Sequence, residues 1–340
     1  MRRALIVGAG SISVAHAAAL DVMPDVEICG VVDPDDENRE KFIADHGVPG
    51  FPHLPEALAA LEVDVAHICT PHDRHVPETL AALAAGVHVL CEKPAGIDLN
   101  DAQQMVDAAA TSIKKVGVCY QNRYNTGALE AKKFLASAAG GKVLGAHANV
   151  AWARRADYYQ QSPWRGRWQQ AGGGVLINQA IHTIDLLTWL LGDPVHISGR
   201  ASQRLLGDLI EVEDTGEAVL THPDGAISTL YCTNANAVNR PAEIEIFCEE
   251  ATLSVRLGLR ITWADGRVEV RQPHDLEGIG PAYWGNAHPA LISDFYARLD
   301  DPEPFWIDPT AALSSLRVVK AIQEASFEPD VMYSYRKDPK

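Results

Sequence analysis

A regular alternation of short apolar runs with Ala-rich stretches over residues 1–120 constrains the fold more than any other feature. Apolar runs of strand length lie at residues 4–7, 28–32, 65–69, 87–91 and 116–120. Helical stretches such as 77–85 and 100–110 separate them. Strands that alternate with helices form βαβ units with right-handed crossovers, and such strands pair in parallel. The first 120 residues are therefore predicted to form a doubly wound, Rossmann-type α/β sheet.

The pattern changes after residue 120. Helices are predicted at 128–137, 175–191, 289–299 and 310–326, and a strand near 144–152. Between 195 and 271, short alternating runs are separated by turn signals such as Pro223-Asp224-Gly225, which is typical of a mostly antiparallel sheet. We therefore expect an α+β domain over 121–340 after the α/β domain over 1–120. No low-complexity linker separates the two, so a tight junction with a cleft is expected there.

Composition excludes several classes of protein. The chain has 29 basic and 45 acidic residues and a formal net charge of −16. Nucleic acids and anionic membranes attract cationic surfaces, so neither is expected as a partner. No apolar run approaches the ~20 residues that span a membrane, and the run after Arg2-Arg3 is too short for a secretion signal. The six cysteines show no C-x-x-C spacing, which predicts free thiols in a cytoplasmic protein and no metal site.

The segment that joins the first predicted strand to the first predicted helix has the form of a dinucleotide fingerprint. Gly8 permits the tight turn, and Gly10 lets the backbone approach a pyrophosphate at the helix N-terminus, beside Ser11 and Ile12. Ser13 stands where the pattern has Gly or Ala, and it is small enough to keep the helix close to the strand. The alternative is a Gly-rich turn that merely joins a strand to a helix.

An acidic residue follows at the spacing that the fingerprint requires. Asp33 ends the second predicted strand, 20 residues after Ser13. A carboxylate there accepts hydrogen bonds from both ribose hydroxyls of the adenosine. More acids follow, with no base before Arg39, so a 2′-phosphate would be repelled. The sequence therefore predicts NAD as the cofactor, with NADP disfavoured.

Two later strand ends carry polar motifs. Thr70-Pro71 and His75 follow the third predicted strand, and Glu92-Lys93-Pro94 follows the fourth. Open α/β sheets bind ligands outside the carboxyl ends of their strands. We therefore expect Thr70, Pro71, His75, Glu92 and Lys93 to line the cofactor site, with Lys93 also reaching a bound hydroxyl. A solvated Lys in a turn is the alternative for Lys93.

The predicted helix 175–191 is apolar on nearly all sides and should be buried. Its polar exceptions include Asn178, His182 and Asp185, whose spacings of four and three place them on one face. Buried polar groups are costly unless they are paired, so this line of groups needs partners. For His182 alone, a satisfied core histidine is the alternative.

These motifs resemble those of the glucose–fructose oxidoreductase/inositol dehydrogenase (Gfo/Idh/MocA) family. The resemblance covers nearly the whole chain and rests on the fingerprint 8–16, Thr70-Pro71 with His75, Glu92-Lys93-Pro94, Arg123 and the segment 172–185. It implies an open antiparallel C-terminal sheet, a site between the domains, and homodimers or homotetramers formed through that sheet. It also implies reversible oxidation of a secondary alcohol on a sugar or cyclitol.

In the family pattern, the residues here at Lys93 and His182 are the catalytic pair. His182 would take the hydroxyl proton while hydride leaves the same carbon for the nicotinamide. Lys93 would stabilise the developing alkoxide. The family commonly has Asp where this chain has Asn178, and Asn can orient His182 but not stabilise its protonated form. Either Lys93 then carries more of the proton transfer, or Asn178 binds a substrate hydroxyl; Asp185 is expected to hold the helix or the His182 ring.

Residues 152–168 contain four arginines and three tryptophans against one acid. Aromatic faces suit the C–H faces of a sugar ring, and guanidinium groups bind carboxylate or phosphate. We therefore expect a substrate that bears an anionic group, read by Arg154, Tyr159, Trp164 and Arg165. Arg123 is expected to reach the cofactor or the substrate. The alternative is a solvated loop or a subunit contact, and equal oxidation of neutral sugars and matched sugar acids would exclude the anion.

Together these features predict a cytoplasmic, NAD-dependent dehydrogenase that acts on a CH–OH group of a sugar, sugar derivative or cyclitol. Two other functions remain open. A redox-neutral enzyme would cleave a glycoside through transient oxidation and release no net NADH. A non-catalytic, NAD-binding regulator would not need the retained Lys93 and His182.

Overall fold

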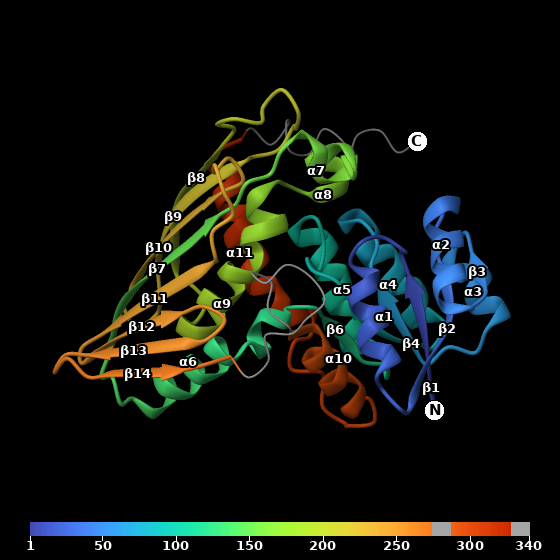
Figure 1. Ribbon diagram of the computed structural model, residues 1–340, viewed down its shortest axis with the longest axis horizontal. Coiled ribbons are helices and arrows are strands. Elements are labelled where there is room, and N and C mark those ends of the chain that lie inside the picture. The colour runs from blue at the N-terminus through green and yellow to red at the C-terminus, as the bar shows by residue number, and fades with distance from the viewer. Residues whose placement is uncertain (274–286, 328–340) are drawn as a thin grey trace. The chain divides into compact units, whose positions relative to one another are not determined.

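The computed structural model describes residues 1–273 and 287–327 (Figure 1). Their internal contacts divide them into two compact units. The first unit contains residues 1–121 and 287–313, and the second contains 122–273 and 314–327. Sequence alone assigns 287–313 to the second domain, whereas the structure places this segment with the first unit.

The first unit is built on a six-stranded parallel sheet with the order β3-β2-β1-β4-β5-β6 (Figure 1). Its strands are β1 (Arg2–Val7), β2 (Val26–Val32), β3 (Gly50–Phe51), β4 (Val65–Ile68), β5 (His88–Cys91) and β6 (Val116–Val118). Its helices are α1 (Ser13–Asp21), α2 (Asp36–His46), α3 (Leu54–Ala60), η1 (His72–Arg74), α4 (His75–Ala84), α5 (Leu99–Thr111) and α10 (Ala287–Ala297). Every residue of β4 and β5 is buried, as in central parallel strands covered on both faces. The predicted Rossmann sheet is confirmed; β3 was not predicted because it has only two residues.

Packing of aromatic side chains explains why 287–313 belongs to this unit. Gly117 in β6 lies so close to Phe295 and Phe305 that a Cβ there would approach each ring to 2.9 Å. The two rings also pack edge to face, with centroids 5.1 Å apart. The Val118 amide donates to the Ile307 carbonyl at 2.8 Å. The segment therefore completes the core at the β6 edge of the sheet.

The second unit is built on an eight-stranded sheet with the order β14-β13-β12-β11-β7-β10-β9-β8. Its strands are β7 (Val143–Ala151), β8 (His196–Ser202), β9 (Thr215–Thr221), β10 (Ile227–Thr233), β11 (Glu243–Cys248), β12 (Ala251–Val255), β13 (Leu259–Trp263) and β14 (Val268–Arg271). Neighbouring strands are antiparallel except for β7 and β10. Burial alternates along β10, so one face of the sheet is packed and the other is exposed. The predicted, mostly antiparallel sheet is confirmed.

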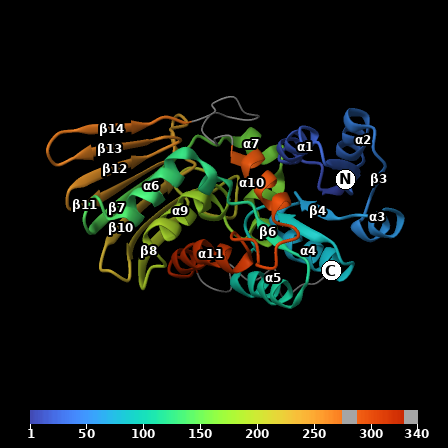
Figure 2. The same cartoon turned by 90° about the horizontal axis from the view of Figure 1, so that it is seen from below.

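Helices cover the packed face of this sheet, and Figure 2 shows α6 and α9 along it. The helices of this unit are η2 (Gln121–Tyr124), α6 (Thr126–Ser137), α7 (Ala156–Gln160), η3 (Pro163–Gly166), α8 (Trp168–Ala171), η4 (Leu176–Ala180), α9 (Ile181–Leu191) and the part of α11 (Pro309–Glu324) after Leu313. The predicted helix 175–191 therefore begins as the π-helical turn η4 and continues as α9. The longer stretch Trp168–Leu191 has the length and hydropathy of a membrane span, which apolar runs alone did not indicate. Because its most apolar window is 78% buried, it is a core helix of this unit.

Candidate active site

The glycine turn between β1 and α1 has the geometry of a dinucleotide fingerprint. Gly8 has a φ of +96°, and a Cβ there would lie 2.7 Å from the Cys69 carbonyl, so only glycine fits. A Cβ at Gly10 would have no neighbour within 4 Å, which leaves the backbone approachable by a ligand. Ser13 is buried, and its hydroxyl donates to the Gly10 carbonyl at 2.6 Å. Ser at the third position therefore keeps both the turn and the close helix packing.

The second strand places an acid beside this turn. Asp33 is buried, and its carboxylate accepts hydrogen bonds from the Ala9 amide at 2.7 Å and the Asp35 amide at 2.9 Å. Arg39 donates to the Asp33 carbonyl at 2.7 Å and pairs with Asp36. The nearest base is thus already bound to this acidic segment. The turn and Asp33 fit the pyrophosphate and ribose of NAD, with half-buried Ile12 and exposed Ser11 at the start of α1.

Asp33→Ser is expected to raise KM for NAD about 10-fold and to move the preference toward NADP. The substitution removes the carboxylate that would bind the ribose hydroxyls and repel a 2′-phosphate. The ratio of kcat/KM for the two cofactors measures the change. Asp45→Ser, which alters an exposed carboxylate of α2, is the control. An unchanged ratio in Asp33→Ser would contradict the assignment.

His75 links the two later strand ends. Its ring is buried, with Nδ1 2.8 Å from the Pro94 carbonyl and Nε2 3.0 Å from the Thr70 carbonyl. Burial lowers the pKa of His75, although the two carbonyls act in the opposite direction. Both ring nitrogens of His75 face backbone carbonyls, and its expected contact with the cofactor stays a prediction. His75 holds the Thr70-Pro71 loop and the Lys93-Pro94 turn, and Thr70 and Pro71 remain half-buried.

Glu92 anchors the turn that carries Lys93. Its buried carboxylate accepts a hydrogen bond from the Lys93 amide at 3.2 Å and lies 3.1 Å from His16 Nε2 and 3.4 Å from His288 Nε2. Burial alone would raise the pKa of Glu92, but His16 and His288 outweigh it and hold this pKa well below its usual range. The carboxylate therefore stays charged and fixes the Lys93 backbone. The structure gives Glu92 this positioning role, and its predicted contact with the cofactor stays a prediction.

The histidines around Glu92 form a hydrogen-bonded network whose members lie far apart in the sequence. His16 Nδ1 lies 2.8 Å from His67 Nδ1, and His67 Nε2 lies 2.9 Å from the Tyr296 hydroxyl. The ligand-type atoms of His16, Glu92 and His288 lie within 4.8 Å of one another, a grouping that also suits a divalent metal. His16 lies in the fingerprint helix α1, so its position near the strand end that carries Glu92 could have been predicted from the sequence. His288 lies almost 200 residues from Glu92 in the chain, and no spacing rule connects them.

In the second unit, the polar residues of η4 and α9 differ in how exposed they are. Asn178 and His182 are half-buried, whereas most of their neighbours on both elements are buried. Asp185 is fully buried and accepts two hydrogen bonds from Arg123, at 2.6 and 2.8 Å. Asp185 therefore holds Arg123 rather than the His182 ring. Arg123 is buried in this ion pair, and its expected contact with the cofactor or the substrate stays a prediction.

The arginine-rich loop 152–168 forms an internal stack. The guanidinium of Arg154 lies 4.9 Å from the Trp152 ring and 5.1 Å from the Tyr158 ring. The guanidinium of Arg165 lies 4.3 Å from the Tyr158 ring and 5.8 Å from the Trp164 ring. These cation–π contacts, together with the burial of Arg154, account for the excess of arginine without a ligand. The expected substrate contacts of Arg154 and Arg165 stay predictions.

The other residues of this loop are also engaged with the protein. Tyr159 is buried in a cluster with Trp168 and Ile210, and its hydroxyl accepts a hydrogen bond from Asn234. Its expected substrate contact stays a prediction. Arg155 faces the carbonyls of Asn236 and Ala237, and Arg167 pairs with Glu211. Trp164 remains partly exposed beside Arg165.

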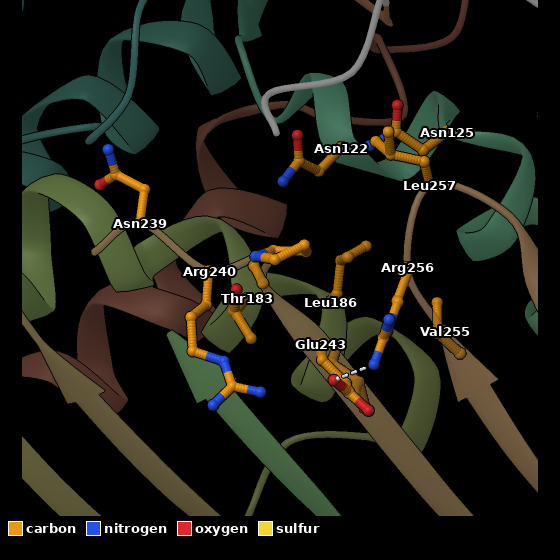
Figure 3. Close-up of a pocket in the computed structure, with 13 residues that line it drawn as sticks. Asn122, Asn125, Thr183, Leu186, Asn239, Arg240, Glu243, Val255, Arg256 and Leu257 are labelled. Carbon is orange, nitrogen blue, oxygen red and sulfur yellow. Dashed lines mark hydrogen bonds and ion pairs between the residues drawn. The ribbon is translucent and has the colours of Figure 1, made fainter. Parts of the chain in front are cut away.

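A cavity of about 370 Å³ lies within the second unit (Figure 3). Thr183 and Leu186 of α9 form one wall, so the cavity adjoins the helix that carries His182. Its polar lining comes from Asn122, Asn125, Asn239, Arg240, Glu243 and Arg256. Its size is that of a small-molecule site. The sequence did not predict it, because its residues come from four separate segments.

Two family models match the chain. One is described as an oxidoreductase family with an NAD-binding Rossmann fold and matches residues 2–120. The other, the GFO/IDH/MocA C-terminal domain, matches residues 128–254. The chain belongs to the Gfo/Idh/MocA oxidoreductase family. As a Gfo/Idh/MocA protein it is an NAD-dependent oxidoreductase, which confirms the predicted class of enzyme and its cofactor.

Individual relatives of this Gfo/Idh/MocA protein carry sugar-related names. A putative UDP-kanosamine synthase oxidoreductase subunit from Amycolatopsis mediterranei is 29% identical over 310 residues, 82% of each chain. A D-glucoside 3-dehydrogenase from Escherichia coli is 30% identical over 194 residues, 56% of this chain and 54% of that protein. The WlbA dehydrogenase from Bordetella pertussis, solved with NADH and UDP-GlcNAcA, is 28% identical with a TM-score of 0.83. That comparison covers 95% of this chain and 96% of the WlbA chain.

Proposed function

We propose that this Gfo/Idh/MocA protein oxidises a secondary alcohol of a sugar, sugar derivative or cyclitol, with Lys93 and His182 handling the hydroxyl proton. The observation that carries the proposal is the anchoring of Lys93. The charged, buried Glu92 fixes the Lys93 backbone at the carboxyl end of β5, in the unit that binds NAD. The sugar-related names of the relatives in both comparisons support the substrate class.

The chemistry requires a base for the hydroxyl proton and a hydride acceptor. NAD, when bound, accepts the hydride that leaves the alcohol carbon. His182 takes the hydroxyl proton, and the Lys93 ammonium stabilises the negative charge that develops on the oxygen. Asn178, one helical turn before His182, orients its ring or binds a neighbouring hydroxyl. Hydride and proton leave the same CH–OH group, so the product is a ketone.

The proposal is tested by following NADH formation over inositols, pyranoses, sugar acids and glycosides, with NAD and NADP in parallel. We expect NADH from at least one sugar or cyclitol with NAD, and weaker turnover with NADP, because Asp33 opposes a 2′-phosphate. Glycoside cleavage without net NADH would identify the redox-neutral alternative. The absence of both NADH and cleavage over the whole panel would contradict the proposal.

We further propose self-association through the sheet of the second unit and a cytoplasmic location. The exposed face of the β8–β14 sheet carries apolar side chains, among them Val219, Tyr231 and Phe247. A homodimer or homotetramer formed through this face stays a prediction, as does a cytoplasmic location.

A further inference from the structure

The cavity of Figure 3 brings together neutral polar groups and two arginines. Three carboxamides, those of Asn122, Asn125 and Asn239, line it, and Thr183 adds a hydroxyl. Such groups both donate and accept hydrogen bonds, as a polyhydroxylated ligand requires. Apolar contacts come from side chains such as Leu186 and Val255. The lining therefore suits a sugar ring rather than a purely apolar ligand.

The charges in this cavity do not cancel. Arg256 donates to Glu243 at 2.7 Å, so this pair contributes no net charge (Figure 3). Arg240 is exposed, and among the described residues no carboxylate lies within ion-pair distance of its guanidinium. Its backbone is fixed on both sides, since its amide donates to the Ala151 carbonyl at 2.9 Å and its carbonyl accepts from Trp152 Nε1 at 3.0 Å. Arg240 thus extends from a fixed backbone and carries a positive charge that no carboxylate of the described residues pairs with.

Several other arginines of this unit are engaged with neighbouring side chains. Arg123 is paired with Asp185, and Arg154 and Arg165 lie against aromatic rings. Arg167 is paired with Glu211. Arg240 lines this cavity without an ion-pair partner among the described residues, in a protein whose net charge is −16.

We propose that this cavity is a subsite for a sugar that carries a carboxylate or phosphate, with Arg240 binding the anionic group. The inference rests on the proposed function, because it assigns the substrate of that enzyme to a class. Leu186 lines the cavity and lies one helical turn after His182 in α9, so these two side chains share a face of the helix. The guanidinium forms charge-assisted hydrogen bonds with the anion, and the carboxamides bind ring hydroxyls.

The test measures binding independently of turnover. Calorimetry in the presence of NADH compares glucuronate and glucose 6-phosphate with glucose, and galacturonate with galactose. We expect each anionic ligand to bind at least about 10-fold more tightly than its neutral partner, and Arg240→Ala to remove that advantage while leaving the neutral sugars unchanged. A charge-assisted hydrogen bond contributes about 1.5–3 kcal/mol, which corresponds to roughly 10- to 100-fold in affinity. The carboxylate and phosphate arms show which anion the subsite takes.

Two further variants separate a specific contact from a change in overall charge. Arg260→Ala removes an exposed arginine from β13 and should not alter binding of either ligand class. Arg256→Ala leaves the Glu243 carboxylate unpaired in the cavity and should weaken only the anionic ligands. Equal binding of charged and neutral sugars by the wild type, equal losses in Arg240→Ala and Arg260→Ala, or no binding of any probe would each overturn the subsite. If anionic sugars bind through Arg240 but yield no NADH, the subsite stands and the proposed oxidation fails.

Discussion

Lys93→Ala is expected to lower kcat for alcohol oxidation by about 10²- to 10⁴-fold, the range for loss of a group that holds or moves a proton at the reacting oxygen. The affinity for NAD should change little, because the Gly8–Gly10 turn and Asp33 that fit the cofactor lie on other loops. KM for the alcohol should change less than kcat, since the Lys93 ammonium acts mainly on charge that develops in the transition state.

The structure explains why the loss of kcat should depend on where the Lys93 ammonium lies and not on its charge alone. The buried network of His16, Glu92 and His288 fixes the Lys93 backbone through one hydrogen bond of 3.2 Å. An arginine at position 93 keeps the charge but cannot place it at the same point or give up its proton. Lys93→Arg should therefore restore only a small part of the lost activity.

The measurement is the initial rate of NADH formation, with NAD affinity followed separately by fluorescence titration. Lys41→Ala, which removes an exposed lysine from α2 of the same unit, is the matched control and should behave as the wild type. His182→Ala, assayed in parallel, shows how the proton transfer is divided in a chain with Asn178. Unchanged turnover in Lys93→Ala with normal NAD binding would contradict the catalytic role and favour a non-catalytic, NAD-binding protein.

The parallel sheet and its ligand-binding edge could be predicted because both follow from local patterns. The apolar runs at 65–69 and 87–91 end at the residues where the structure ends β4 and β5, within one position. The glycine turn needs only the positive φ of Gly8 and the open space at Gly10, which the G-x-G spacing encodes. The antiparallel sheet was predicted for the same reason, since period-two patterns and turns are local signals.

The surroundings of the site could not be predicted, because they depend on contacts between distant segments. Arg154 and Arg165 gave a strong local signal, but the sequence could not show that both guanidinium groups lie against aromatic rings. Arg240 gave no signal, because the cavity that it lines is built by several segments and because only the fold shows that no carboxylate of the described residues pairs with it. Likewise, nothing in the spacing of His16, Glu92 and His288 indicates that the three side chains meet.

The pairing of Arg123 with Asp185 could not be predicted either. Helical spacing placed Asp185 on the same face as His182, but it does not indicate a partner 62 residues away in the chain. Both side chains are at least 95% buried, and two hydrogen bonds join them. Removing one partner from such a pair leaves the other as an uncompensated buried charge. The free energy of unfolding should therefore fall more after a single substitution than after the replacement of both residues.

Asp185→Asn is expected to reduce the free energy of unfolding of the second unit by about 3–5 kcal/mol, because Arg123 would remain charged and buried without a carboxylate. Urea unfolding monitored by tryptophan fluorescence measures the loss. Asp265→Asn also removes an aspartate from an Arg pair, but that pair is exposed, so its unfolding midpoint should match the wild type. The double variant Arg123→Met/Asp185→Leu should recover much of the stability that Asp185→Asn loses, because apolar side chains of similar volume leave no buried charge. A loss below about 1 kcal/mol in Asp185→Asn, or a double variant less stable than the single one, would show that the pair is not the buried anchor of α9 that its geometry indicates.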